Sequence, residues 1–331
     1  MVSKIKKGFL IPLCIIVALA YTGCKESEYH RTEGLIWNTA YHITFKGDKS
    51  LEDSVMTVLD DVGKSLNVFD TTSLVSRVNR NISTVVDEHF KRVYKASLDV
   101  NSKSYGMFDP TLSPLIAAWG FGMGHTPTAD TLNIDAIMKY VGIGKTHLNG
   151  DTLVKENPDI SFNFSAVAKG YACDAVGAML RRNEVTDYLV EIGGEIVASG
   201  VSPSMTQWKV SIDRPVVSDS IIHDSSAIIK LTDAGLATSG NYRNFHMEKG
   251  HRFGHTISPK TGRPVATDVV SATVIAPTAM MADAMATSCM AAGSEVSKTM
   301  VSSAGYEALL ILADSTVWIT PGLEKLLIND R

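Results

Sequence analysis

The spacing of apolar positions predicts several helices and strands. Leu51, Val55, Leu59, Val62 and Leu66 recur at helical intervals, which predicts an amphipathic helix from Ser50 to Leu66. Further helices are expected over 87–101, 166–182 and from Pro277 to about 292. Strands are expected over 35–45, 159–164, 188–198 (broken by two glycines), 208–213, 227–231 and 269–275, with a closing hairpin over 306–312 and 316–320.

These strands and helices do not alternate in regular βαβ units. The order therefore favours an α+β fold, a single large mixed domain with antiparallel sheets flanked by helices. No G-x-G-x-x-G follows a strand and no phosphate-binding P-loop is present, so the sequence speaks against a Rossmann or P-loop site. It also lacks zinc-type Cys and His spacing and the G-x-S-x-G of acyl hydrolases.

The first residues read as an export signal rather than as part of the fold. A lysine-rich start is followed by a short apolar run, too short for a stable membrane span, and then by Tyr21-Thr22-Gly23-Cys24. Small residues before Cys24 are typical of a lipoprotein cleavage site, although Tyr21 departs from the usual Leu. We expect a signal peptide over 1–23 and a lipidated tether over 24–34; the alternative is an ordinary signal peptide with a chance cysteine.

Composition narrows the class of protein. A net charge of −4 argues against non-specific nucleic-acid binding. The four cysteines do not indicate a disulfide framework, because Cys14 would leave with the signal and Cys24 would carry lipid. The sequence leaves open whether the remaining Cys173 and Cys289 pair.

Asp283 and Thr287 stand out in the helix after Pro277. They are four residues apart, so their oxygens share one face among small and apolar neighbours. A buried carboxylate needs a partner, and a hard cation such as Mg²⁺ would supply one. From these residues alone, a basic partner or a capping role is the simpler interpretation.

Lys169 lies where the 159–164 strand is expected to end and the next helix to begin. Helix N-termini offer N–H groups and partial positive charge to phosphates, and Lys169 would add a full charge. The plainer alternative is a surface lysine at an ordinary turn. Two glycine-containing segments, 191–195 and 238–242, would let backbone approach a ligand, and His255 precedes a turn rich in Pro and Gly.

Taken in order, seven segments of the chain resemble the FAD:protein FMN transferase family, the ApbE-type lipoproteins. The resemblance covers about Leu35 to Leu327. It rests on 65–69 with 73–79, 106–111 with 119–122, 168–174, 192–195, 239–243, His255 with 258–262, and 282–287.

The resemblance implies a role for each matching residue. Mg²⁺ would be bound by the side chains of Asp283 and Thr287 and by the carbonyl of Ala166. His255 matches the family's histidine near the reacting phosphate. Contacts to FAD are implied for Trp37, Phe69, Met107, Phe108, Asp109, Asn163, Lys169 and Ile257.

Three positions depart from the family pattern. The first expected strand has Trp37-Asn38-Thr39 where the family has Met-Gly-Thr, and Trp37 is assigned the flavin contact of that Met. Ser258 stands where Asp is common, and Asn163 where a carboxylate often lies.

The implied reaction is Mg²⁺-dependent transfer of FMN from FAD to a Thr or Ser hydroxyl of an acceptor flavoprotein, with release of AMP, by a catalytic domain over 35–331. The enzyme would be exported and anchored to the bacterial cell membrane through lipid on Cys24, facing the periplasm. Two alternatives stay open: an FAD pyrophosphatase that uses water as the acceptor, and a non-catalytic flavin-binding lipoprotein.

Overall fold

The computed structural model describes residues 28–121, 133–213, 225–240, 245–248, 251–254 and 256–328. The expected signal peptide, Cys24 and His255 lie outside the described residues. In these ranges no helix combines the length and the apolar character needed to cross a membrane.

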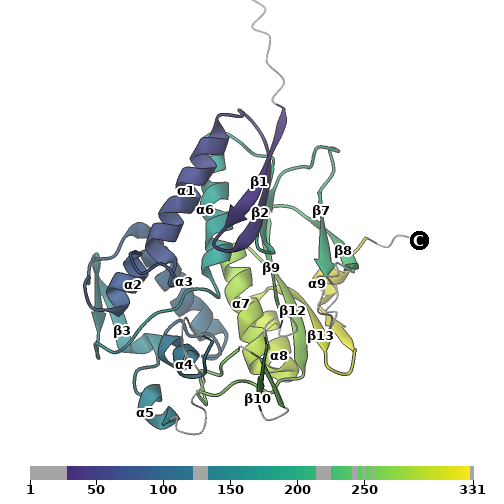
Figure 1. Ribbon diagram of the computed structural model, residues 1–331. Coiled ribbons are helices and arrows are strands. Elements are labelled where there is room, and N and C mark those ends of the chain that lie inside the picture. Colours follow the sequence, from purple (N-terminus) through teal and green to yellow (C-terminus); the bar gives the residue numbers. More distant parts are fainter. Residues whose placement is uncertain are drawn as a thin grey trace, which may run out of the picture.

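An eight-stranded sheet forms the centre of the molecule (Figure 1). Its strands, in spatial order, are β1 (Tyr29–Ile36), β2 (Thr39–Lys46), β5 (Tyr188–Ile192), β6 (Glu195–Ser199), β9 (Ala234–Gly240), β12 (Val269–Ala276), β13 (Glu307–Leu312) and β14 (Val317–Ile319). Every neighbouring pair is antiparallel. The expected α+β fold with antiparallel sheets and flanking helices is confirmed.

Helices cover one face of this sheet. The helices α1 (Leu51–Leu66) and α6 (Ala168–Arg182) lie over the β2–β5–β6 side, and α7 (Ala279–Ala292) lies over β9 and β12. Outside them pack α3 (Glu88–Lys103) and α8 (Ser294–Ala304). Alternate residues of β2, among them Ile43 and Phe45, are fully buried against these helices, as period-two alternation in a half-covered strand requires.

A hairpin packs on the opposite face of the sheet, from β6 to β13. Its strands are β7 (Trp208–Asp213) and β8 (Ser225–Leu231), and α9 (Pro321–Glu324) adds Leu323 to the same apolar cluster. Smaller elements complete the described fold: α2 (Leu74–Asn79), α4 (Ser113–Ala118), α5 (Ile134–Met138), a 3₁₀ turn (Ile143–Lys145), β3 (Thr146–Asn149), β4 (Thr152–Lys155), β10 (Phe245–Glu248) and β11 (His251–Gly254).

The N-terminal region differs from the expected tether and single strand. Tyr29 already belongs to β1, and a two-residue turn at Trp37 and Asn38 separates β1 from β2. Both turn residues have positive φ (48° and 63°), the conformation that suits the twist of a tight hairpin. β1 reads as polar because it is an edge strand with one exposed face. It is nevertheless fixed, because the Tyr29 hydroxyl donates to the Val201 carbonyl (2.8 Å).

The expected strand over 159–164 is wrong. Asn79, the last residue of α2, replaces a neighbouring strand: its Nδ2 donates to the Phe162 carbonyl (2.8 Å) and its Oδ1 accepts from the Phe162 N–H (2.7 Å). The Lys155 ammonium donates to the carbonyls of Pro158 and Ile160 (3.2 and 3.0 Å). The side chains of Asn79 and Lys155, together with a backbone hydrogen bond from Asn163 to Pro110, hold this segment in place of a strand partner.

Candidate active site

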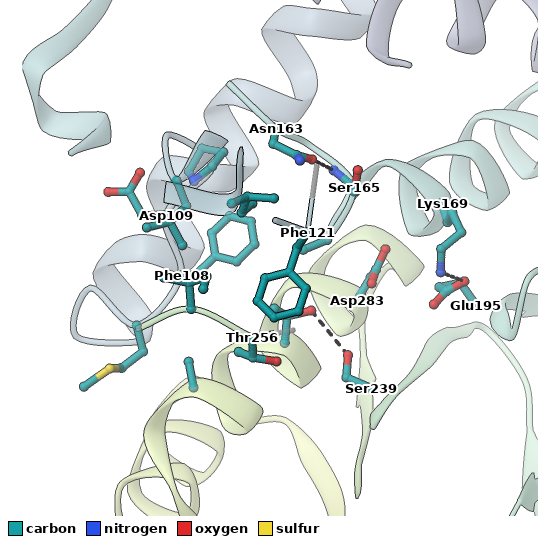
Figure 2. Close-up of a pocket in the computed structure, with 18 of the residues that line it drawn as sticks. Phe108, Asp109, Phe121, Asn163, Ser165, Lys169, Glu195, Ser239, Thr256 and Asp283 are labelled. Carbon is teal, nitrogen blue, oxygen red and sulfur yellow. Dashed lines mark hydrogen bonds and ion pairs between the residues drawn. The ribbon is translucent and has the colours of Figure 1, made fainter. Parts of the chain in front are cut away.

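A cavity of about 640 Å³ opens where α6, α7, β6 and β9 meet the loops that precede α4 and follow β11 (Figure 2). Two walls of different chemistry face each other across it. The charged wall consists of Lys169, Glu195, Asp283 and Thr287. The loop wall consists of Phe69, Met107, Phe108, Asp109 and Ile257.

The charged wall is built on a very close approach between α6 and α7. A Cβ on Gly170 would overlap the carbonyl of Ala279, and a Cβ on Gly235 of β9 would overlap the backbone nitrogen of Ala279. Asp174, one turn further along α6, accepts hydrogen bonds from the N–H groups of Ala279 and Met280 (both 2.9 Å). The start of α7 is therefore fixed against α6 by backbone contacts and a capping carboxylate.

This contact places Asp283 beside the first turn of α6. Asp283 is buried, and its Oδ2 accepts the Gly170 N–H (3.1 Å). The N–H groups of Val167 and Ala168 donate to the Phe164 carbonyl (2.9 and 2.8 Å). The N–H groups of Val167 and Ala168 therefore already have an acceptor within the protein. At the expected phosphate site, the Lys169 ammonium remains as the group that would bind phosphate.

Lys169 forms an ion pair with Glu195 of β6, drawn as a dashed line in Figure 2. The Glu195 side chain is 5% exposed, whereas that of Lys169 is 33% exposed and reaches the cavity. Burial raises the pKa of Glu195 and of Asp283, and the Lys169 ammonium opposes both shifts. Burial lowers the pKa of Lys169, but the carboxylates of Glu195 and Asp283 outweigh it and leave this pKa above its ordinary value.

The charged wall thus holds two carboxylates and one ammonium group. When all three groups are ionised, one negative charge is left over beside the cavity, and a cation would neutralise it. Thr287 adds a hydroxyl one turn after Asp283, and the Ser239 hydroxyl lies 3.3 Å from it. In the described residues no group of three or more His, Cys, Asp and Glu side chains could hold a metal. One carboxylate with hydroxyl and carbonyl oxygens fits Mg²⁺, which binds few protein ligands and completes its shell with phosphates and water.

The loop wall is held by hydrogen bonds between side chains and backbone. Asp109 accepts from the Thr111 N–H (2.8 Å) and from the Ile143 N–H (3.0 Å), so its carboxylate shapes the loop. Asn101 donates to the Phe108 carbonyl (2.6 Å). Phe69 is 55% exposed at the cavity, and an exposed aromatic ring on a pocket wall is suited to stacking on a planar ligand.

Asn163 joins the two walls. Its N–H donates to the Pro110 carbonyl of the loop wall (2.7 Å), and its Oδ1 accepts from the Ser165 N–H (2.9 Å) just before α6. A carboxylate at this position would offer the same acceptor oxygen, so Asn163 supports the turn without adding a negative charge.

The ApbE family model matches residues 37–310 of this chain. The chain belongs to the ApbE family. It is 32% identical over 303 residues to a curated FAD:protein FMN transferase of Vibrio cholerae, covering 87% of this chain and 89% of that protein. It is 29% identical to the protein of the same name from Escherichia coli, covering 96% and 97% of the two chains.

Solved structures of this family share the fold. The flavin transferase ApbE from Vibrio cholerae superposes with a TM-score of 0.80 at 29% identity and covers 91% of this chain and 100% of that one. The apo form of the flavinyl transferase ApbE from Pseudomonas stutzeri gives a TM-score of 0.80 at 27% identity, with 91% and 97% covered.

In this ApbE-family chain most of the residues expected at the site line one cavity. They are Phe69, Met107, Phe108, Asp109, Asn163, Ala166, Lys169, Ile257, Asp283 and Thr287. His255 lies outside the described residues, although the next residue, Thr256, lines the cavity.

Trp37 is not among the residues that line this cavity. It packs instead on the main apolar core, and its indole lies against α1, where a Cβ on Gly63 would come within 2.7 Å of Nε1. The flavin contact of Trp37 therefore stays a prediction.

Glu195 has no role assigned from the sequence, where it closes the glycine-containing segment 191–195. In the structure it is a buried carboxylate on the cavity wall. The signal available in the sequence was a charged residue at the start of an otherwise apolar strand.

Proposed function

We propose that this chain transfers the FMN phosphoryl group of FAD to a Thr or Ser hydroxyl of an acceptor flavoprotein and releases AMP. The acceptor oxygen would form a new bond to the FMN phosphorus while the bond from that phosphorus to the AMP oxygen breaks. The observation that carries the proposal is the charged wall, where Lys169 and Asp283 line a large cavity together with the side chains of Phe69, Met107 and Phe108 on the loop wall. The names of the curated relatives support the same reaction.

Each wall would contact a different part of FAD. Lys169 would orient the negatively charged pyrophosphate, and positioning of this kind makes a large contribution to phosphoryl transfer. The exposed ring of Phe69 and the apolar surface of Met107 and Phe108 would contact planar parts of the substrate and exclude water.

Asp283 and Thr287, through their side chains, and Ala166, through its carbonyl, would hold Mg²⁺. Bound there, Mg²⁺ would offset the negative charge that develops on the phosphoryl oxygens. His255 is assigned as the base that accepts the proton of the attacking hydroxyl, a task that suits an imidazole with a near-neutral pKa. This role of His255 rests on the family resemblance and its neighbour Thr256 at the cavity.

The proposed location is the outer face of the bacterial cell membrane, with lipid on Cys24. Only residues 25–28 separate Cys24 from the first residue of β1. At about 3.5 Å per extended residue, the anchor would keep the edge of the sheet within roughly 18 Å of the membrane. Exported or membrane-bound flavoprotein subunits would then be the acceptors within reach.

An incubation of the chain from residue 25 with FAD, Mg²⁺ and a protein carrying a Thr acceptor tests the proposal. Intact mass and AMP release are followed together. The proposal expects a gain of one FMN on the acceptor, matched by AMP and abolished by EDTA. AMP without acceptor modification would favour the pyrophosphatase, and FAD binding without AMP would favour the non-catalytic carrier.

A further inference from the structure

Lys169 has two buried carboxylates within electrostatic reach but pairs with only one of them. Its ammonium forms the ion pair with Glu195 on β6, while Asp283 on α7 is bound to the neighbouring Gly170 N–H. Both carboxylates nevertheless raise the pKa of Lys169. Lys169 is therefore within electrostatic range of two carboxylates, and its ammonium pairs with Glu195.

The β5–β6 turn explains why Lys169 pairs with Glu195. Gly193 has a positive φ (64°), and a Cβ there would approach the Lys169 side-chain carbon Cδ to 3.3 Å, so the β5–β6 turn lies against the stem of the lysine. Glu195 follows two residues later and takes the ammonium at the end of that stem. The Glu195 backbone is itself tied to α6, because the Cys173 Sγ donates to its carbonyl (3.1 Å).

Without the Glu195 charge, Asp283 would be the remaining anion beside the ammonium. Lysine has a long flexible stem and a compact charge, so a small rotation changes its partner. An ammonium paired with Asp283 would occupy the carboxylate and place positive charge where a cation would bind. The two positive groups would then compete for one anion.

We propose that Glu195 is a positioning residue that holds the Lys169 ammonium away from Asp283 and so keeps the Asp283 carboxylate available to a divalent cation. This inference rests on the proposed function, because it concerns the same cation. It assigns Glu195 no contact with the metal and none with the reacting atoms.

The test measures Mg²⁺ binding by calorimetry on the whole mature chain without FAD, and repeats it with Mn²⁺ by electron paramagnetic resonance. Four proteins are compared: wild type, Glu195→Gln, Lys169→Met and the double variant. Removing the support of a metal ligand typically costs about 10- to 100-fold in affinity, and Glu195→Gln is expected to fall in this range. The double variant should bind within about threefold of Lys169→Met alone, because no lysine is left to compete.

Two outcomes would overturn the proposal. Unchanged metal affinity in Glu195→Gln would show that Lys169 does not compete for Asp283. An equal loss with and without Lys169 would show that Glu195 is itself a ligand or shapes the pocket directly.

A matched control is Glu33→Gln, which removes an exposed carboxylate from β1 of the same sheet and should leave metal affinity unchanged. Thermal unfolding of each variant separates misfolding from weakened binding. Failure of the proposed function would give a different result. A wild-type protein that binds no Mg²⁺ and still transfers FMN in EDTA would show that the reaction needs no divalent cation.

Discussion

The charged wall and the loop wall of the cavity are held in place by different means. In the charged wall, α6, α7 and β9 meet backbone to backbone at Gly170, Ala279 and Gly235. In the loop wall, side chains such as those of Asp109 and Asn101 bind the backbone of an irregular segment. Positions of charge are thus set by packed regular elements, whereas the surface offered to the planar parts of a ligand is set by loops.

The difference predicts how each wall responds to change. Packed backbones cannot move aside, so one added methyl group or one lost charge in the charged wall should have a large effect. In the loop wall the Phe69 ring is exposed, and a substitution there removes contact area without displacing its neighbours. Four substitutions test this contrast, from the largest expected effect to the smallest.

Asp283→Asn should cause the largest loss of activity. The amide oxygen still accepts the Gly170 N–H, but the negative charge at the cavity is gone. Charge stabilisation by a metal is worth several kcal/mol, so transfer should fall on the order of 10²-fold or more. Stability should not fall, because a buried charge is removed. Flavinylation rates and urea unfolding measure the two effects, with the exposed helical Asp60→Asn as control; activity near the wild-type level would contradict the assignment.

Gly170→Ala should damage the same wall through its backbone. The new methyl group would overlap the Ala279 carbonyl and push α7 away from α6. Overpacking typically costs about 1–3 kcal/mol, and a rigid backbone partner places this case at the upper end. Gly144→Ala is the control, because a Cβ there meets no atom within 4 Å. Equal unfolding midpoints for the two variants would show that the α6–α7 contact can relax.

The α6–α7 contact behind the charged wall should also make stability depend on pH, through Asp174. Burial raises the pKa of Asp174 from 3.8 to about 6, so the folded protein keeps this proton to higher pH than the unfolded chain does. The contribution of this group to stability is therefore full below about pH 4 and is lost as the pH rises through about 6, a change of about 3 kcal/mol.

Asp174→Asn isolates that contribution. The variant should lose stability less steeply than the wild type between pH 4 and 7 in urea titrations, although it also loses part of the cap on α7. The other carboxylates with raised pKa values, Glu195 and Asp283, act in both proteins and cancel in the comparison. Parallel curves for the two proteins would mean that Asp174 titrates as in the unfolded chain.

Phe69→Ala should have the smallest effect. The ring is 55% exposed, so its loss removes a stacking surface and leaves the core intact. Aromatic stacking contributes about 1 kcal/mol, which corresponds to roughly fivefold weaker FAD binding. Phe69→Trp should retain the affinity. Fluorescence titration with FAD measures both, and a hundredfold loss in Phe69→Ala would show that the loop wall is as rigid as the charged wall.

The sequence predicts best where a single helix or strand buries one regular face. The spacing of Leu51 to Leu66 is enough for α1, and Asp283 and Thr287 do share a face of α7 at the cavity. The family resemblance adds the loop residues, whose meeting depends on contacts that no local pattern encodes.

Three features could not be read from local patterns. β1 has the polar composition of an exposed edge strand, which a tether shares. The segment before α6 has apolar alternation, but its partner is the side chain of Asn79 rather than a strand. Glu195 lies in an apolar strand, and its importance depends on Lys169, which approaches from α6.

The most direct test of the central claim is the location of a divalent cation in the charged wall. Crystals grown with Mn²⁺ in place of Mg²⁺, with and without FAD, would be examined for anomalous scattering. The account predicts one peak beside the Asp283 carboxylate and the Thr287 hydroxyl, and no peak at Glu195. A peak on Glu195, or Mn²⁺ bound away from the α6–α7 contact while transfer still requires the metal, would contradict it.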